Sequence, residues 1–296
     1  MPAPILTASG TAGHGAELAA YGDLAALGAV VVKSLSVDPW PGNPAPRVHP
    51  AAGGAGMLNS VGLQGPGIAA WLDHDLPAML ATGARVVASV WGRTVEDYRK
   101  AAELLASAPP GVVAVEVNLS CPNLDGGRHL FAQSAGDSAE VIGACVDALG
   151  DRPVWAKLTA AVTSVVDVAA AVDDAGAAAV TCINTLLGMV LDLETRSYAL
   201  GGGGGGLSGP AIHPVAVRAV HDVHAALPAL PIVGVGGVSS GADAAELLLA
   251  GASAVQVGTA TFADPRAPWR VQSELDEWCR AHGVGAVREL IGAVHG

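Results

Sequence analysis

Short apolar runs alternate with helical patterns of hydrophobic and polar residues along almost the whole chain. The apolar runs are rich in β-branched residues, as in Val112 to Val117, and have the length of buried strands. Eight such runs predict strands at about residues 5–8, 29–33, 85–90, 112–117, 153–157, 178–183, 232–235 and 254–257. Helical patterns lie between them, near residues 15–27, 67–82, 94–107, 138–149, 163–175, 211–227 and 241–250, and a last one follows near 268–282. Strand and helix alternating eight times predict an α/β fold, a (β/α)8 TIM barrel.

The chain shows no linker and no break in composition, so we expect a single domain over residues 1–296. A barrel of this kind typically needs about 250 residues. The extra length falls in long loops at about 35–66, 119–137 and 186–210. Loops this long are commonly functional lids or disordered segments. The run of six glycines at 201–206 is interpreted as a flexible tip and not as a phosphate cradle.

Composition narrows the classes of partner. Hydrophobic residues make up 51% of the chain and charged residues 14%, which is typical of a globular, core-rich protein. The net charge of −12 and the lack of a Lys/Arg cluster argue against nucleic acid, although an anionic small substrate stays possible. No apolar run is long enough to cross a bilayer, and the N-terminus lacks a signal-peptide pattern, so we expect no membrane partner. The four cysteines show no CxxC pair and no zinc spacing, which predicts no metal site and a reducing cytoplasm.

The stretch Asn118-Leu119-Ser120-Cys121-Pro122-Asn123 is the strongest candidate for chemistry. It places a thiol between carboxamides where the strand at 112–117 ends, and active sites of parallel α/β folds lie at this end of the strands. A cysteine there can act as a base or nucleophile if its surroundings favour the thiolate. A small buried residue is the plainer interpretation of a lone cysteine. The other strand ends reverse that preference.

Polar residues follow several of the other predicted strands. Ser9 follows the first strand, Lys33 and Ser34 the second, Lys157 the fifth, and Asn184 with Thr185 the sixth. A lysine at the end of an apolar strand is costly unless it meets a partner or an anion. Two such lysines at one barrel mouth indicate a bound anionic or electron-accepting group.

Glycines mark the last two strand ends. Gly236 and Gly237 follow strand seven, and Gly258 with Thr259 follows strand eight. Barrels often bind phosphate with these two loops, because backbone N–H groups approach closely where no Cβ intervenes. The alternative is a pair of tight turns with no ligand.

Together these motifs resemble class 1 dihydroorotate dehydrogenase, a family of FMN-containing barrel enzymes of pyrimidine synthesis. Met57-Leu58-Asn59 and Asn184 to Met189 are more similar to subclass 1B, whose enzymes work with an iron–sulfur flavoprotein subunit that delivers electrons to NAD. The matching motifs are Ala8 to Thr11, Val32 to Ser34, Met57 to Gln64, Asn118 to Asn123, Lys157 to Thr159, Ile183 to Thr185, Gly206 to Pro210, Gly236 to Val238, and Gly258 with Thr259.

The resemblance implies oxidation of (S)-dihydroorotate to orotate, with Cys121, Lys33 and Lys157 as catalytic residues. Cys121 would remove the proton from C5, and hydride from C6 would pass to N5 of FMN. Lys33 would lie between flavin and substrate. Lys157 would lie near the N1/O2 edge of the flavin, where a preplaced cation stabilises developing charge.

The resemblance also implies two sets of binding residues. Those for the substrate are Lys33, Asn59, Val61, Gly62, Leu63, Asn118, Asn123, Asn184 and Thr185. Those for FMN are Ser9, Lys33, Ser34, Asn118, Lys157, Ile183, Gly209, Gly236, Gly237, Gly258 and Thr259.

The chain departs from the family pattern in two loops. Ala160, Ala161 and Ser164 replace the Pro-Asn and Asp that usually follow the fifth strand, and residues 124–129 carry an added Arg and His. These loops leave open a changed substrate preference or a changed lid. The alternative enzymes are a related flavin-dependent dihydropyrimidine oxidoreductase and a fumarate-using class 1A enzyme. A flavin-binding barrel without catalysis is a third alternative. The expected partners are dihydroorotate or orotate and an iron–sulfur, FAD-containing electron-transfer subunit, in a homodimer or heterotetramer.

Overall fold

The structure is a computed structural model that describes residues 2–54, 56–120 and 130–296. In these residues, parallel strands form an eight-stranded sheet in the order β1-β14-β13-β8-β7-β6-β5-β2. Their bounds are β1 Ile5–Thr7, β2 Val30–Val31, β5 Val86–Val90, β6 Val112–Asn118, β7 Val154–Lys157, β8 Ala179–Cys182, β13 Ile232–Val235 and β14 Ala254–Val257. The two edge strands meet, because Thr7 N donates to Ala29 O at 3.3 Å and Val31 N donates to Thr7 Oγ1 at 3.0 Å. The predicted (β/α)8 barrel is therefore confirmed.

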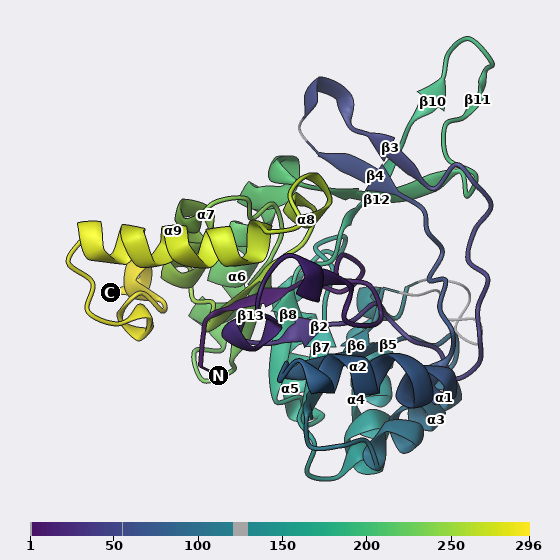
Figure 1. The fold of residues 1–296 in the computed structure, drawn as a ribbon, viewed down its shortest axis with the longest axis horizontal. Coiled ribbons are helices and arrows are strands. Elements are labelled where there is room, and N and C mark those ends of the chain that lie inside the picture. The colour runs from purple at the N-terminus through teal and green to yellow at the C-terminus, as the bar shows by residue number, and fades with distance from the viewer. Residues whose placement is uncertain (1, 55, 121–129) are drawn as a thin grey trace.

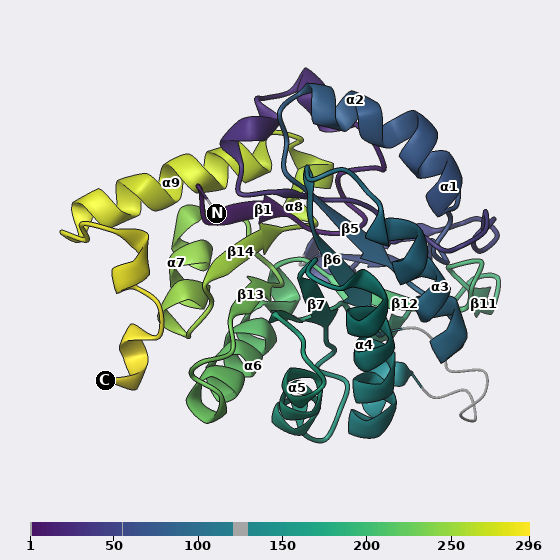
Figure 2. The same ribbon diagram turned by 90° about the horizontal axis from the view of Figure 1, so that it is seen from below.

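Helices surround the strands in a ring, as Figure 2 shows. Their bounds are α1 Ile68–Ala70, α2 Leu76–Ala81, α3 Val95–Ala106, α4 Ala135–Leu149, α5 Val165–Asp174, α6 His213–Ala226, α7 Gly241–Leu249, α8 Ala260–Ala263 and α9 Ala267–Ala281. One π-helical segment, Trp71–Asp75, joins α1 to α2. Sequence signals for these helices are local: Thr94 and Ser240 each form a capping box at the start of α3 and α7.

The predicted helix at 15–27 is wrong. Two short 3-10 helices, Glu17–Ala20 and Leu24–Ala26, occupy this segment. Gly22 separates them, and a Cβ there would lie 2.6 Å from Trp269 Cε2 of α9. Asp23 then begins the second turn by accepting a hydrogen bond from Ala25 N at 2.9 Å. A continuous helix is therefore interrupted at Gly22, where the chain packs closely against Trp269 of α9.

A second, antiparallel sheet lies over the barrel mouth. It joins β3 Val48–Pro50, β4 Met57–Asn59, β12 Gly204–Ser208 and β9 Leu186–Met189, in the order β3-β4-β12-β9. The hairpin of β10 Leu191–Asp192 and β11 Ser197–Tyr198 projects beyond this sheet (Figure 1). Two of the predicted long loops, 35–66 and 186–210, therefore build a second sheet. The interpretation of the glycine run as a flexible tip is wrong for Gly204 to Gly206, which pair with β4 and β9.

The inside of the barrel changes from apolar to polar toward the carboxyl ends of the strands. A buried apolar cluster draws on all eight strands and includes Leu6, Val87, Ala114, Trp155 and Ala179. Residues two positions apart on a strand share a face. The next inward layer therefore holds polar side chains, namely Ser89 on β5, Glu116 on β6, Lys157 on β7, Thr181 on β8 and Gln256 on β14. This polar layer lies beneath the barrel mouth.

Candidate active site

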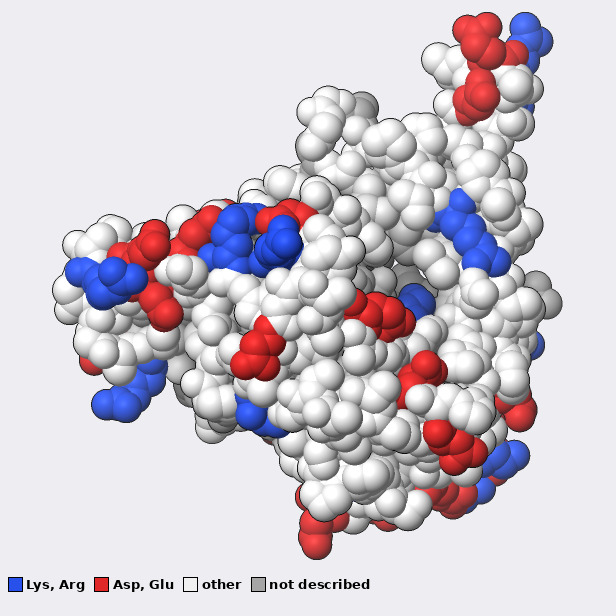
Figure 3. All heavy atoms as spheres, viewed as in Figure 1, with Lys and Arg blue, Asp and Glu red and all other residues white. Residues whose placement is uncertain are grey.

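A pocket of about 320 Å³ opens at the carboxyl ends of the barrel strands and is walled on one side by the second sheet. Its volume lies within the range of small-molecule sites. Figure 3 shows the hollow in this face, with a basic side chain inside it. The long segments after β2 and β8 therefore close over the end of the barrel where parallel α/β enzymes bind substrates.

Every described residue that the sequence assigned to substrate or cofactor lines this one pocket. These residues are Ser9, Lys33, Ser34, Asn59, Val61, Gly62, Leu63, Asn118, Lys157, Ile183, Asn184, Thr185, Gly209, Gly236, Gly237, Gly258 and Thr259. Cys121 and Asn123 lie outside the described residues. The individual roles of all these residues stay predictions.

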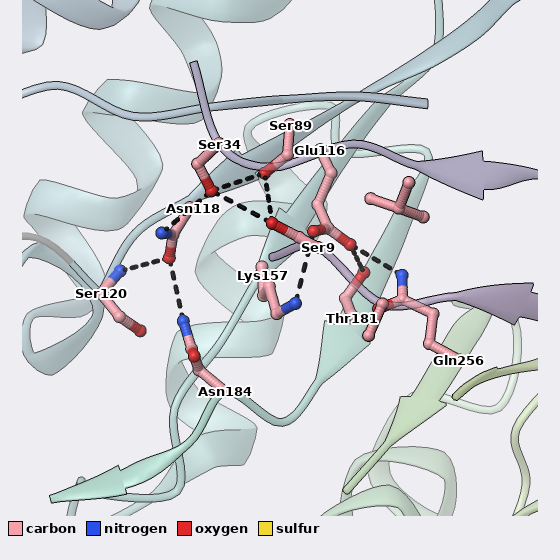
Figure 4. Close-up of polar contacts among 12 residues, drawn as sticks. Ser9, Ser34, Ser89, Glu116, Asn118, Ser120, Lys157, Thr181, Asn184 and Gln256 are labelled. Carbon is pink, nitrogen blue, oxygen red and sulfur yellow. Dashed lines mark hydrogen bonds and ion pairs between the residues drawn. The ribbon is translucent and has the colours of Figure 1, made fainter. Parts of the chain in front are cut away.

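Asn118, the last residue of β6, is the centre of a hydrogen-bond network at the pocket wall (Figure 4). Its Oδ1 accepts from Asn184 Nδ2 at 2.9 Å and from Ser120 N at 3.2 Å. Its backbone carbonyl accepts from Tyr98 Oη at 2.8 Å. The Asn118 carboxamide is therefore fixed from the loop after β8 and from its own loop, and its backbone is fixed from α3.

Three serine hydroxyls brace the neighbouring wall. Ser34 Oγ lies 2.9 Å from Ser89 Oγ and 3.2 Å from Ser9 Oγ, and Ser9 Oγ lies 3.3 Å from Ser89 Oγ. Ser9 and Ser34 line the pocket, while Ser89 supports them from inside the barrel. The contacts tie the loops after β1 and β2 to β5.

Lys157 lies at the bottom of the pocket and pairs with a buried carboxylate. Its Nζ is 3.4 Å from Glu116 Oε1, and both side chains are nearly or completely buried. The other oxygen, Glu116 Oε2, accepts from Thr181 Oγ1 at 3.0 Å and from Gln256 Nε2 at 2.9 Å. Glu116, Thr181 and Gln256 were not predicted from the sequence. The signal for Glu116 was present, since it is the one charged residue within the apolar run of β6.

The second sheet contributes the wall that faces the barrel. Asn59 Nδ2 donates to Gly206 O at 3.3 Å. A Cβ on Gly206 would lie 2.1 Å from Thr185 Oγ1, and one on Gly205 would lie 2.5 Å from Asn59 O. The glycines of β12 therefore allow Asn59 and Thr185 to pack closely against this strand.

The turn after β13 needs glycine for conformation and for space. Gly236 and Gly237 have φ values of 137° and 70°, which side chains rarely adopt. A Cβ on Gly237 would also lie 2.6 Å from His213 Cβ and 2.9 Å from Gly209 O. His213 Nδ1 donates to Gly236 O at 2.8 Å and fixes the turn from α6, a contact that sequence analysis missed.

The three described cysteines, Cys145, Cys182 and Cys279, are free and buried. Burial raises the pKa of the Cys145 and Cys182 thiols to about 12 and also raises the pKa of Cys279. A thiol with a raised pKa is a poor source of thiolate at neutral pH. This leaves Cys121 as the candidate for thiolate chemistry.

The part of the chain that the structure describes contains neither a candidate metal site nor a membrane-spanning helix. No group of three or more His, Cys, Asp or Glu side chains there could hold a metal ion. Among the same residues, no helix is both long and apolar enough to span a membrane.

A barrel with a polar, lysine-containing pocket at its carboxyl end is the architecture of a small-molecule enzyme. The family model for dihydroorotate dehydrogenase matches residues 1–278 of the chain. Two catalytic subunits named dihydroorotate dehydrogenase B (NAD(+)), from Geobacter sp. (strain M21) and Citrifermentans bemidjiense, are each 45% identical to it over 291 residues. Those alignments cover 98% of this chain and 94% of each relative. A third, from Trichlorobacter lovleyi, is 43% identical over 293 residues, which cover 99% of this chain and 95% of the relative.

The chain therefore belongs to the dihydroorotate dehydrogenase family and is an oxidoreductase. The similarity to B-type catalytic subunits confirms the predicted resemblance to subclass 1B.

Proposed function

We propose that this chain oxidises (S)-dihydroorotate to orotate on a bound FMN, with Cys121 as the base. Oxidation of dihydroorotate in pyrimidine biosynthesis follows from membership of the family. The observation that carries the rest of the proposal is the convergence of Lys33, Lys157 and the carboxamides of Asn59, Asn118 and Asn184 on one pocket.

The residues of the pocket support the binding of FMN. Gly209, Gly236, Gly237 and Gly258 line the pocket, and the first three have positive φ values that a residue with a Cβ rarely adopts. Such a turn suits the close approach of a phosphate. Lys157 supplies a cation where a redox group would gain negative charge. When bound, FMN would accept two electrons from the substrate.

The remaining pocket residues would bind and orient the substrate. Asn118 and Asn184 hold each other, so the remaining N–H groups and lone pairs of the two carboxamides present a fixed pattern to a planar ring. Ser120 Oγ is buried at the pocket and has no hydrogen-bond partner among the described residues, so it offers one more contact. Backbone N–H groups of Val61 to Leu63 would meet the substrate carboxylate.

The B-type relatives are named as NAD(+)-dependent catalytic subunits, and this name implies a partner that carries electrons to NAD. We infer an iron–sulfur, FAD-containing partner for this chain, as the resemblance to subclass 1B implies. NAD in the relatives' names favours this acceptor over fumarate. Free thiols at Cys145, Cys182 and Cys279 support a cytoplasmic location.

The experiment is anaerobic reduction of the purified protein. Acid treatment should release about one FMN per chain, and dihydroorotate should bleach the visible flavin spectrum. The chain alone should reduce NAD slowly. Release of FAD, the absence of flavin after reconstitution, or a flavin that dihydroorotate leaves oxidised would contradict the proposal. Bleaching by another dihydropyrimidine but not by dihydroorotate would favour the related oxidoreductase.

A further inference from the structure

Glu116 is a completely buried carboxylate inside the barrel, below the pocket and not on its wall. Three side chains from three other strands donate to it: Lys157 on β7, Thr181 on β8 and Gln256 on β14. Figure 4 shows these side chains turned toward the carboxylate. The roles inferred above for the pocket do not use this residue.

The two oxygens of the Glu116 carboxylate have different partners. Thr181 and Gln256 both bind Oε2, at 3.0 and 2.9 Å, and so leave Oε1 to face the Lys157 ammonium. A buried ammonium is costly without a countercharge, and a buried carboxylate is costly without donors. Thr181 and Gln256 therefore stabilise the carboxylate, and the carboxylate stabilises the ammonium.

We propose that Glu116 is a positioning residue that keeps Lys157 charged at the bottom of the pocket before any electrons arrive. The proposal rests on the FMN-dependent function proposed above. The pocket side of Lys157 would then meet the flavin, while the barrel side is held by Glu116. Lys157 would already be protonated when the flavin is reduced, so it would take up no proton during reduction.

No other carboxylate among the contacts of the described residues could serve as the counter-ion of Lys157. Glu116 faces Lys157 from β6, and β8 and β14 present the neutral side chains of Thr181 and Gln256. Lys33 is the other lysine that lines the pocket within the described residues, and its positive charge cannot replace a carboxylate.

The contacts around Glu116 also suit a conservative substitution, Glu116→Gln. Gln256 Oε1 is buried and has no hydrogen-bond partner among the described residues. In Glu116→Gln, the Gln256 amide can turn so that this oxygen accepts from the new carboxamide. The variant therefore removes the charge while it keeps the volume and a hydrogen bond to Gln256, and the Thr181 hydroxyl can rotate to accept from the same amide nitrogen.

The test is the pH dependence of the midpoint potential of the bound FMN. Each proton taken up with two electrons adds about 30 mV per pH unit to the slope, because a tenfold change in equilibrium is 29.6 mV for a two-electron couple. In Glu116→Gln the unpaired lysine should lose its proton and regain it when the flavin is reduced. The slope should therefore be steeper than that of the wild type by about 30 mV per pH unit over part of the neutral to alkaline range.

The double variant Glu116→Gln/Lys157→Met is the matched control. It has no lysine at position 157 to take up the proton, so its slope should return to the wild-type value. Equal slopes in the wild type and in Glu116→Gln would overturn the proposal, and so would a steep slope that persists in the double variant.

Folding gives a second readout. If Glu116→Gln fails to fold while the double variant folds and binds FMN, the damage comes from a lone buried ammonium, as proposed. If both fail, Glu116 is needed for the barrel independently of Lys157, and the proposal is overturned. Wild-type FMN content is measured first, so that its absence counts against the proposed function and not against the role of Glu116.

Discussion

Asn184 Nδ2 donates a 2.9 Å hydrogen bond to Asn118 Oδ1 and ties the loop after β8 to the end of β6. The orientation of each carboxamide is fixed further by a backbone N–H, from Thr185 to Asn184 Oδ1 at 2.8 Å and from Ser120 to Asn118 Oδ1 at 3.2 Å. Two carboxamides from strands that are not neighbours in the barrel thus act as one rigid recognition unit.

Removing one member of this unit should weaken substrate recognition. Asn184→Ala takes away a donor and frees the Asn118 carboxamide, so we expect orotate to bind about tenfold more weakly, or ~1.4 kcal/mol. Asn184→Asp should be worse, because a carboxylate would face Asn118 Oδ1. Flavin content should not change in either variant, and orotate titration of the flavin spectrum provides the measurement. Unchanged orotate affinity in both would show that this pair does not contact the ligand.

Gly237 should be essential for holding the cofactor. Ala at this position meets both a φ of 70° and a Cβ contact of 2.6 Å with His213, so we expect Gly237→Ala to lose most of its bound flavin. Gly143→Ala is the matched control, since its Cβ would meet nothing within 4 Å and the residue lies inside α4. That control should retain flavin and gain about 0.5–1 kcal/mol in stability. Equal flavin content in the two purified variants would contradict the role of the turn.

Stability should depend on the protonation of His14. Burial lowers the pKa of this imidazole, with Asp75, Lys33 and Glu17 as weaker influences, and its Nε2 has no hydrogen-bond partner among the described residues. A lowered folded-state pKa means that the unfolded chain binds the proton more tightly. This contribution to stability is therefore complete above about pH 6.5 and is lost as pH falls below it.

His14→Phe removes that proton site without removing a hydrogen bond from Nε2. The slope of unfolding free energy against pH should be shallower in the variant between pH 6.5 and 5, by at most about 1.4 kcal/mol per pH unit. Urea unfolding at several pH values measures it. Parallel pH profiles for the variant and the wild type would show that His14 stays solvated.

The projecting hairpin and the adjoining strand β9 should contact another chain. Leu187, Met189, Leu191, Leu193 and Tyr198 are exposed there, and Leu193 is 82% exposed. Clustered apolar side chains at a protruding surface are typical of protein interfaces. We expect Leu191→Ser/Leu193→Ser to lower the mass of the assembly in light scattering, whereas Leu104→Ser on α3 should not. The same mass for all three proteins would exclude the hairpin from the interface.

The barrel was predictable because its strands are short β-branched runs whose sides are both buried, and such runs are visible locally. Ile232–Val235 and Ala254–Val257 were found with their observed bounds. The pocket residues that follow the apolar strands were predictable for a related reason, since the carboxyl ends of parallel strands gather at one mouth. Asn59, Val61 to Leu63 and Gly209 follow no predicted barrel strand, and their assignment rested on the resemblance to the family.

The errors came from contacts between segments that are distant in the chain. Gly204 to Gly206 form a strand only because β4 and β9 pair with it, and nothing in a glycine run signals those partners. Gly22 interrupts a helical pattern because Trp269 of α9 packs against it. Glu116 was missed because its donors come from β7, β8 and β14, which the sequence places 41, 65 and 140 residues away.

The central claim is that dihydroorotate reduces the flavin of this chain with help from the Cys121 thiolate, and anaerobic stopped-flow reduction across pH tests it most directly. A positioned base contributes typically 10²–10⁴-fold, so Cys121→Ala should slow flavin reduction on roughly that scale while FMN and orotate still bind. Cys121→Ser should also be slow near neutral pH and should recover partly as pH rises, because a hydroxyl holds its proton more tightly than a thiol. Reduction of the Cys121→Ala flavin at the wild-type rate would contradict the account.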